Sequence, residues 1–305
     1  MTTATDRMPA ISLAAVPGRR HRTTELITEI ERRGFSGIFC PSLGDAMGLC
    51  LSIAHLTSRL EFGTAIQPIY FQLPAALAYQ AAYINEIADG RFRLGIGVAH
   101  APTHSRLGIS VGKPLADTSE YVESMQKPGE QMGGLPPITL ATLRDKMVGL
   151  ATEIGDGAVW ANASRSRMGH SLSLIPQAKR DDGFYVGNMI PTVIDEDREA
   201  GAARNRATLK GYVTLPNYRN YWKDAGYEEE MAAVEKAMEA NDSTAILAAM
   251  SDEWLSDCTL YGSAGEVRDG VEAWLDAGVP SPILVPSSTS GGQLKAFEEL
   301  FAAFD

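Results

Sequence analysis

Residues 93–98 read RLGIGV, a short run in which every position after the first is apolar or glycine. Residues 11–16 (ISLAAV) and 36–40 (SGIFC) have the same character. A strand that is apolar on both faces is typical of a parallel sheet covered by helices, whereas a half-exposed antiparallel strand alternates apolar and polar residues. The three runs therefore predict an α/β fold built on a parallel sheet.

Outward from these runs, short apolar segments alternate with segments of helical period along nearly the whole chain. We expect strands at residues 10–16, 37–40, 60–67, 93–98, 137–141, 156–160, 184–190 and 283–285. We expect helices at residues 23–33, 46–57, 74–88, 145–154, 263–277 and 293–303. Eight strands, each followed by a helix, favour a (β/α)8 TIM barrel over a doubly wound sheet, which more often has five or six strands.

Residues 195–260 interrupt this alternation, because they contain helical patterns and no clear strand. We interpret them as a helical insertion after the seventh strand, within a single barrel domain formed by residues 1–305. We expect the insertion to cover the substrate. Its aromatic residues, Tyr218, Tyr221 and Trp222, are candidate wall residues, although aromatic side chains are more often used for packing.

The composition excludes several classes of partner. Against 38 acidic residues the chain has 27 basic ones, a net charge of −11, which argues against nucleic-acid binding and against an anionic membrane surface. Residues 62–85 are uncharged, but their glutamines and prolines argue against a membrane span. Residues 1–7 lack a secretory pattern and are expected to form a frayed tail. Three cysteines without metal-ligand or CxxC spacing predict reduced thiols, and therefore a cytoplasmic protein.

The segment that follows RLGIG resembles several binding motifs without matching them. His100 replaces the third glycine of a dinucleotide fingerprint, and we expect Pro102 to prevent an immediate helix. His100 and His104 have the spacing of a helical metal site, but Pro102 lies between them and no acidic residue is near, so we expect no metal. The chain also lacks a Gly-x-Ser-x-Gly elbow and a Walker loop, which argues against hydrolases and NTPases.

In a barrel of this kind the reactive groups gather at the carboxyl ends of the strands. Apart from His100 and Arg144, the residues at these ends are uncharged. Hydrolysis and phosphoryl transfer need carboxylate or metal clusters, whereas a small apolar mouth suits a flat aromatic cofactor.

Several segments of the chain, taken in order, resemble one family. They are GTAIQP at residues 63–68, LPAALAYQAA at residues 73–82, DGRFRLGIG at residues 89–97, GDG at residues 155–157 and YGSAGEV at residues 261–267. This series is similar to the luciferase-like flavin- and deazaflavin-dependent oxidoreductases. The resemblance implies a TIM barrel, a homodimer, and either FMN or the deazaflavin coenzyme F-420 lying across the strand ends.

The resemblance also implies which residues hold the cofactor. In family members that use the deazaflavin, a non-prolyl cis peptide backs the tricyclic ring, and Ala65 and Ile66 occupy its position. Gly97 and Val98 fall along the ring, where backbone and ring approach closely. The phosphate-bearing tail is assigned to the start of the helix after the fifth strand, where amide groups and a cation would bind an anion. The residues at that helix start are Ala141, Thr142, Leu143 and Arg144. Asn162, which follows the sixth strand, is assigned to the same cofactor.

His100 occupies the position where several relatives have an acidic residue. Hydride reduction of an activated double bond leaves a carbanion or enolate, and a histidine is able to protonate it near neutral pH. The alternative is that His100 only hydrogen-bonds the cofactor or a backbone carbonyl. We assign the substrate pocket to Pro41 and Ser42 with Tyr218 and Trp222. Some deazaflavin dehydrogenases have an Asp-His pair where this chain has Pro41 and Ser42, which argues against an alcohol or sugar dehydrogenase.

Two further expectations concern the surface. The helix at residues 74–88 is apolar all round, and a barrel covers only one face of a helix, so we predict a homodimer through this helix. The alternative is that the chain's own insertion covers it. Residues 126–135 are expected to form a short loop, which removes a segment that often contributes to the substrate pocket.

We therefore predict an oxidoreductase that transfers a hydride between a reduced ring and a small organic substrate. Coenzyme F-420 is preferred as the cofactor and FMN is the alternative. An FMN-dependent monooxygenase is the second candidate function, and a flavin-binding barrel without turnover is the third.

Overall fold

The structure of the protein is a computed structural model that describes residues 8–305, so the tail expected at residues 1–7 lies outside the described residues. The strands are β1 Ala10–Ser12, β2 Gly37–Cys40, β3 Glu61–Thr64, β4 Gln67–Pro68, β5 Phe92–Gly97, β6 Ile138–Ala141, β7 Gly157–Ala161, β8 Tyr185–Ile194, β9 Leu260–Gly262 and β10 Ser281–Ser287. The helices are α1 Arg20–Arg32, α2 Ala46–Leu56, α3 Pro74–Ile87, α4 Ala101–Leu107, α5 Pro114–Gln131, α6 Asp145–Ile154, α7 Met168–Ser173, α8 Gln177–Asp181, α9 Arg198–Val213, α10 Pro216–Asp224, α11 Glu228–Glu239, α12 Ser243–Ala248, α13 Asp252–Cys258, α14 Ala264–Asp276 and α15 Gln293–Ala303. Two short 3-10 helices, η2 Ile69–Phe71 and η3 Arg165–Arg167, complete the described elements.

The chain divides into two compact units. Unit 1 comprises the residues up to 160 together with 174–187, and unit 2 comprises residues 161–173 and 188–305. In unit 1, strands β1, β2, β3, β5, β6 and β7 pair in that order, and β4 pairs with β5, every pairing being parallel. In unit 2, β8 pairs with β9 in parallel and also with β10.

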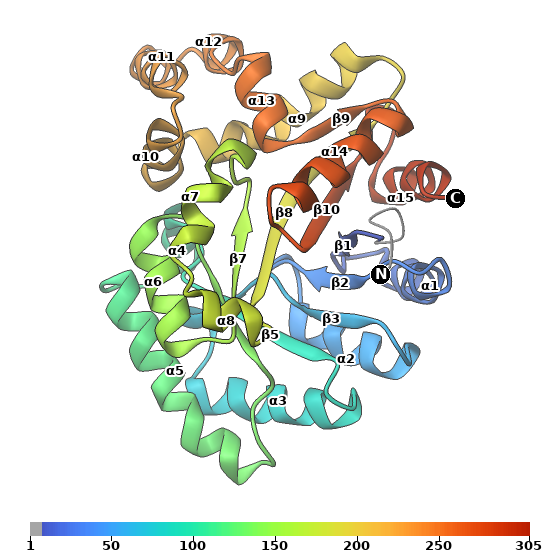
Figure 1. Ribbon diagram of the computed structural model, residues 1–305, viewed down its shortest axis with the longest axis vertical. Helices are drawn as coiled ribbons and strands as arrows, with labels where there is room; N and C mark the ends of the chain where they lie inside the picture. The colour runs from blue at the N-terminus through green and yellow to red at the C-terminus, as the bar shows by residue number, and fades with distance from the viewer. Residues whose placement is uncertain (1–7) are drawn as a thin grey trace. The chain divides into compact units, whose positions relative to one another are not determined.

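The order of the whole sheet is β10-β1-β2-β3-β5-β6-β7-β8-β9, and the further pairing of β10 with β8 closes eight strands into a ring. Helices separate the successive strands of this ring along the chain (Figure 1). The fold is therefore an α/β TIM barrel, and the predicted fold class is confirmed.

Strands β3 and β5 approach so closely that the run RLGIGV needs its first glycine. A Cβ atom on Gly95 would lie 1.9 Å from the carbonyl oxygen of Thr64, which is far inside contact distance. The Thr64 hydroxyl donates to the Gly95 carbonyl over 2.6 Å. This contact at the sheet explains why a strand that is otherwise apolar has a glycine at this position.

Most predicted elements agree with the structure to within a few residues. Helices α6 and α15 have the predicted bounds. Ser263 caps α14 through a capping box with Glu266, in which each side chain bonds the other residue's backbone N–H. The predicted insertion contains helices α9 to α13.

Other expectations were wrong in detail. Pro102 does not prevent a helix, because it lies in the first turn of α4, where a missing N–H costs nothing. The expected loop at residues 126–135 is largely helical, since α5 extends to Gln131 with Pro128 inside it. The expected strand at residues 60–67 is split into β3 and β4, and β9 was not predicted.

Candidate functional site

Three of the predicted cofactor residues meet at the carboxyl ends of β3, β5 and β6 in unit 1. A Cβ atom built on Gly97 would lie 2.6 Å from the Cβ of Ala141 and 3.2 Å from Cγ1 of Ile66. Gly97 is therefore required because these two side chains fill the space beside it. We call the contact of Ile66, Gly97 and Ala141 the strand-end floor.

The backbone around the strand-end floor matches the predicted pattern. The peptide bond between Ala65 and Ile66 is cis, as the resemblance implied. Pro68, in β4, is paired with Gly97 in β5, so the segment after this bond remains within the sheet. Val98, the residue after Gly97, is half-buried.

The predicted phosphate-binding segment leads from β6 into α6. The backbone N–H of Thr142 donates to the Val159 carbonyl over 2.9 Å, which extends the pairing of β6 with β7. Arg144 is the N-cap residue of α6 and is exposed. Lys146 adds a positive charge to the first turn and Asp145 adds a negative one. The structure thus has a helix start with an arginine at its N-cap, and its role in binding phosphate stays a prediction.

His100 lies between the left-handed Ala99, whose φ is 59°, and the first residue of α4. Its side chain is partly buried. Burial lowers the pKa of His100, and the neighbouring His104 lowers it further. Because the usual pKa of histidine is near 6.5, this imidazole is neutral at pH 7. A neutral ring can donate or accept a hydrogen bond, and it is a proton donor in its charged form only at lower pH.

His104 contributes to this region although the sequence reasoning considered it only as a metal ligand. Its ring is buried, and Nε2 lies 2.5 Å from the carbonyl oxygen of Val98. The described part of the chain holds no group of three or more potential metal-ligating side chains.

In unit 2, Asn162 follows β7 in a left-handed conformation with φ of 58°. Its backbone N–H donates to the Met189 carbonyl, and its own carbonyl accepts the indole N–H of Trp222 over 3.3 Å. Asn162 is only 4% exposed, and its side-chain amide faces the hydroxyl groups of Tyr212 and Tyr218. The amide is therefore packed among aromatic residues of unit 2, and the assignment of Asn162 to the cofactor stays a prediction.

The aromatic residues of the insertion that were predicted as pocket walls are packed together. Tyr218 is 4% exposed and Trp222 is fully buried. The Trp222 ring lies 5.3 Å from that of Tyr218 and 4.9 Å from that of Trp254, between ring centres. These side chains form part of the core of unit 2, and they have too little exposed surface to line a pocket.

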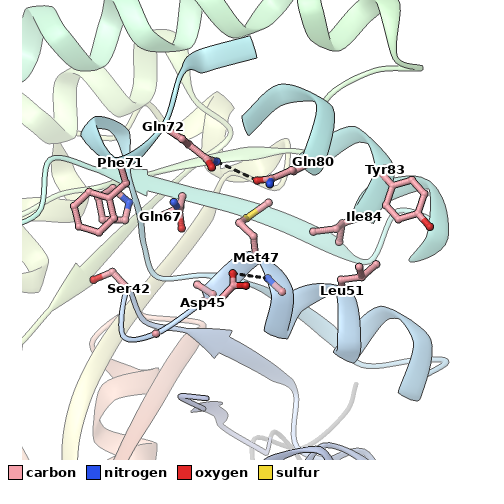
Figure 2. Close-up of a pocket in the computed structure, with 14 residues that line it drawn as sticks. Ser42, Asp45, Met47, Leu51, Gln67, Phe71, Gln72, Gln80, Tyr83 and Ile84 are labelled. Atoms are coloured by element: carbon pink, nitrogen blue, oxygen red, sulfur yellow. Dashed lines mark hydrogen bonds between the residues drawn. The ribbon is translucent and has the colours of Figure 1, made fainter. Parts of the chain in front are cut away.

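Unit 1 contains a cavity of about 290 Å³ next to the ends of β2 and β4 (Figure 2). Its lining includes Ser42, which was predicted to line the substrate pocket, and side chains that were not assigned to that pocket: Asp45, Gln67, Phe71, Gln80 and Tyr83. Figure 2 shows Gln72 donating to Gln80 over 3.1 Å across one side of the cavity. The lining mixes polar and apolar side chains and carries a single carboxylate, that of Asp45, which suits a small organic ligand with hydroxyl or carbonyl groups.

Comparison with known proteins places this geometry in a family. A family model described as luciferase-like monooxygenase matches residues 3–281. A 5,10-methylenetetrahydromethanopterin reductase of Archaeoglobus fulgidus is 26% identical over 258 residues, which cover 74% of this chain and 77% of the relative.

Two solved structures share the fold. The coenzyme F420-dependent tetrahydromethanopterin reductase of Methanopyrus kandleri aligns with a TM-score of 0.74 at 16% identity, covering 96% of this chain and 97% of that one. The oxygenating component of 3,6-diketocamphane monooxygenase from Pseudomonas putida, in complex with FMN, aligns with a TM-score of 0.61 at 16% identity, covering 97% and 96%. Every helix within residues 8–305 is too short or too polar to span a bilayer. The predicted resemblance is thus confirmed, and the chain belongs to the luciferase-like monooxygenase family.

Proposed function

We propose that the protein is an oxidoreductase that transfers a hydride between reduced coenzyme F-420 and a small organic substrate. The observation that carries the proposal is the strand-end floor, where Ile66, Gly97 and Ala141 bring an uncharged surface to the end of the sheet. A flat ring needs such a surface on one side, while charged groups there would favour other chemistries.

The residues fit a cofactor that has a planar ring and an anionic tail. Ala65 and Ile66 would support the ring from β3, and Val98 would lie along it from β5. The exposed guanidinium of Arg144 and the start of α6 would bind the phosphate, with Thr142 and Leu143 shaping that turn. Asn162 remains a predicted cofactor residue on the family resemblance alone. When bound, the deazaflavin supplies the hydride.

We assign proton handling at the substrate to His100. Its lowered pKa means that the charged form is populated only in acidic solution, so a rate that depends on this acid rises as the pH falls through a value below 6.5. In the hydrogen-bonding alternative, the neutral ring orients a substrate or cofactor oxygen and the rate lacks this dependence. A pH profile of the native protein and of His100→Ala separates the two roles.

We propose that the substrate pocket includes Pro41 and Ser42 at the end of β2. The cavity that Ser42 shares with Gln67 supports this assignment. Tyr218 and Trp222 remain predicted wall residues, but their burial supports a packing role instead.

FMN is the alternative cofactor, with monooxygenation as the second function. The FMN complex of the 3,6-diketocamphane monooxygenase component, which shares the fold, favours keeping this candidate. A flavin-binding barrel without turnover is the remaining candidate. Hydride transfer is distinguished from oxygenation by whether product forms without oxygen.

We further propose that the protein is a cytoplasmic homodimer and that residues 1–305 form a single domain. The three buried free cysteines support the location. On α3, Tyr79 and Tyr83 are 45% and 53% exposed, and Leu73 just before the helix is 75% exposed. The other side of α3 packs against α2 and α5 (Figure 1). Light scattering of the native protein and of Tyr83→Lys tests the dimer, which we expect the substitution to weaken.

Fluorescence titration of the purified protein with F-420 and with FMN tests the proposed function. We expect saturable binding, tighter for F-420, and weaker by about tenfold in Arg144→Ala, because one charge-assisted contact to phosphate is lost. Arg22→Ala, which removes an exposed arginine from α1, is the matched control and should bind normally. Native protein that binds neither cofactor would overturn the proposal.

A further inference from the structure

The turn that follows β5 depends on a buried histidine. Ala99 has a left-handed backbone, which residues with a Cβ atom rarely adopt. The carbonyl groups on both sides of it are bound by α4: the His104 ring binds the carbonyl before it, and the main chain of the helix binds the one after it. The His104 ring lies 2.5 Å from the Val98 carbonyl oxygen, and the His104 backbone N–H donates to the His100 carbonyl over 3.1 Å. His104 therefore closes the turn that contains Ala99.

The hydrogen bond to the Val98 carbonyl shows which ring nitrogen of His104 carries a proton. A carbonyl oxygen only accepts hydrogen bonds, so Nε2 of His104 must carry a hydrogen and donate it. The residue is 8% exposed, and water therefore competes poorly for the bond.

A second set of contacts holds the His104 ring in place. The ring of Tyr70, in η2, meets it edge-on, with 5.4 Å between ring centres and an interplanar angle of 87°. The Tyr70 hydroxyl donates to Asp117 in α5 over 2.5 Å. Asp117 also accepts the backbone N–H groups of Gly112 and Lys113, over 2.9 and 3.1 Å. These contacts connect the segment after β4, helix α4 and the start of α5 around one imidazole.

We propose that His104 is a positioning residue: its ring fixes the Val98 carbonyl and, through the turn at Ala99, the direction of the His100 side chain. The inference rests on the proposed function, because that function puts Val98 along the cofactor and His100 at the substrate. The spacing of the two histidines, considered above for a metal site, thus serves a different purpose: one helical turn brings His104 back over the backbone that presents His100.

The test compares two substitutions of His104. In His104→Gln the side-chain amide is able to donate to the Val98 carbonyl, whereas in His104→Leu the ring's volume is largely kept and the donor is lost. We expect F-420 affinity within about threefold of the native value for the glutamine variant and about tenfold weaker for the leucine variant. His55→Gln, at an exposed position of α2, is the matched control and should change nothing.

Nitrogen-15 spectra of the histidine rings give a readout that does not need the cofactor. We expect Nε2 of His104 to be protonated in the native protein, and the His100 ring signals to shift in His104→Leu but to stay in place in His104→Gln. If His104→Leu fails to fold, the native spectrum and the glutamine variant decide. An unprotonated Nε2, or His100 signals that move in the glutamine variant, would overturn the inference.

The outcome is separable from that of the proposed function. If the native protein binds neither cofactor, the proposed function fails. If it binds F-420 and a folded His104→Leu variant binds it equally tightly, with His100 signals unchanged, only the positioning role fails.

Discussion

Replacing Gly97 by alanine should destabilise the protein by overpacking the strand-end floor. The added Cβ would lie 2.6 Å from the Cβ of Ala141 and 3.2 Å from Ile66, and contacts under 3.0 Å force the neighbours to move. Extra carbon atoms in a packed site typically cost about 1–3 kcal/mol of unfolding free energy. We expect a loss in this range, measured by urea unfolding followed by circular dichroism.

Two companion variants sharpen this prediction. Ala141→Gly removes the nearest atom, so the double variant Gly97→Ala/Ala141→Gly should recover much of the loss, and the two effects should not add. Gly149→Ala, within α6, is the matched control, because its Cβ would meet nothing within 4 Å. That change should stabilise the protein by about 0.5–1 kcal/mol, the usual gain from glycine to alanine in a helix. Native-like stability of Gly97→Ala, or no recovery in the double variant, would refute the packing argument.

Three further predictions concern other groups. The Tyr70 hydroxyl donates to Asp117 and lowers the pKa of that carboxyl, as do the backbone N–H groups that Asp117 accepts. The ionised Asp117 should therefore stabilise the protein fully above pH 4, and this contribution should decline as the pH falls further. Asp117→Asn should remove this part of the pH dependence of the unfolding free energy, measured in urea. Glu31 accepts the backbone N–H groups of residues 58, 59 and 60 over 2.8, 2.8 and 3.1 Å. Glu31→Ala should therefore lower the unfolding free energy by about 1 kcal/mol, and an unchanged urea midpoint would show that these bonds do not stabilise the fold. The chain has three buried thiols, those of Cys40, Cys50 and Cys258, and burial raises the pKa of the Cys50 and Cys258 thiols. A thiol-specific dye should therefore react with the cysteines only after unfolding, and rapid labelling of the native protein would contradict their burial.

The fold could be predicted because it depends on patterns that are local in the sequence. Apolar runs such as RLGIGV identify buried strands, and helical periods between them identify the covering helices. The details that failed depend on exact position or on distant partners. Pro102 was misjudged because its effect changes between the first turn of a helix and its interior. Strand β9 was missed because its three residues are defined only by pairing with β8.

The site was predicted in part for the same reason. Ile66, Gly97 and Ala141 meet because parallel strands of a barrel end at the same edge, so the order of the predicted strands was enough to suggest this contact. The bond from His104 to Val98 was missed because nothing in the i, i+4 spacing of two histidines shows that one ring turns back to the backbone. The burial of Trp222 was likewise invisible, because aromatic residues on an amphipathic pattern serve as core and as pocket wall alike.

A crystal structure of the protein with F-420 would show where the cofactor binds. We expect electron density for the tricyclic ring against Ile66 and the Gly97–Val98 backbone, with the phosphate at Arg144 and the start of α6. Density for the ring elsewhere, for example in the cavity beside Ser42 and Gln80, would contradict this expectation.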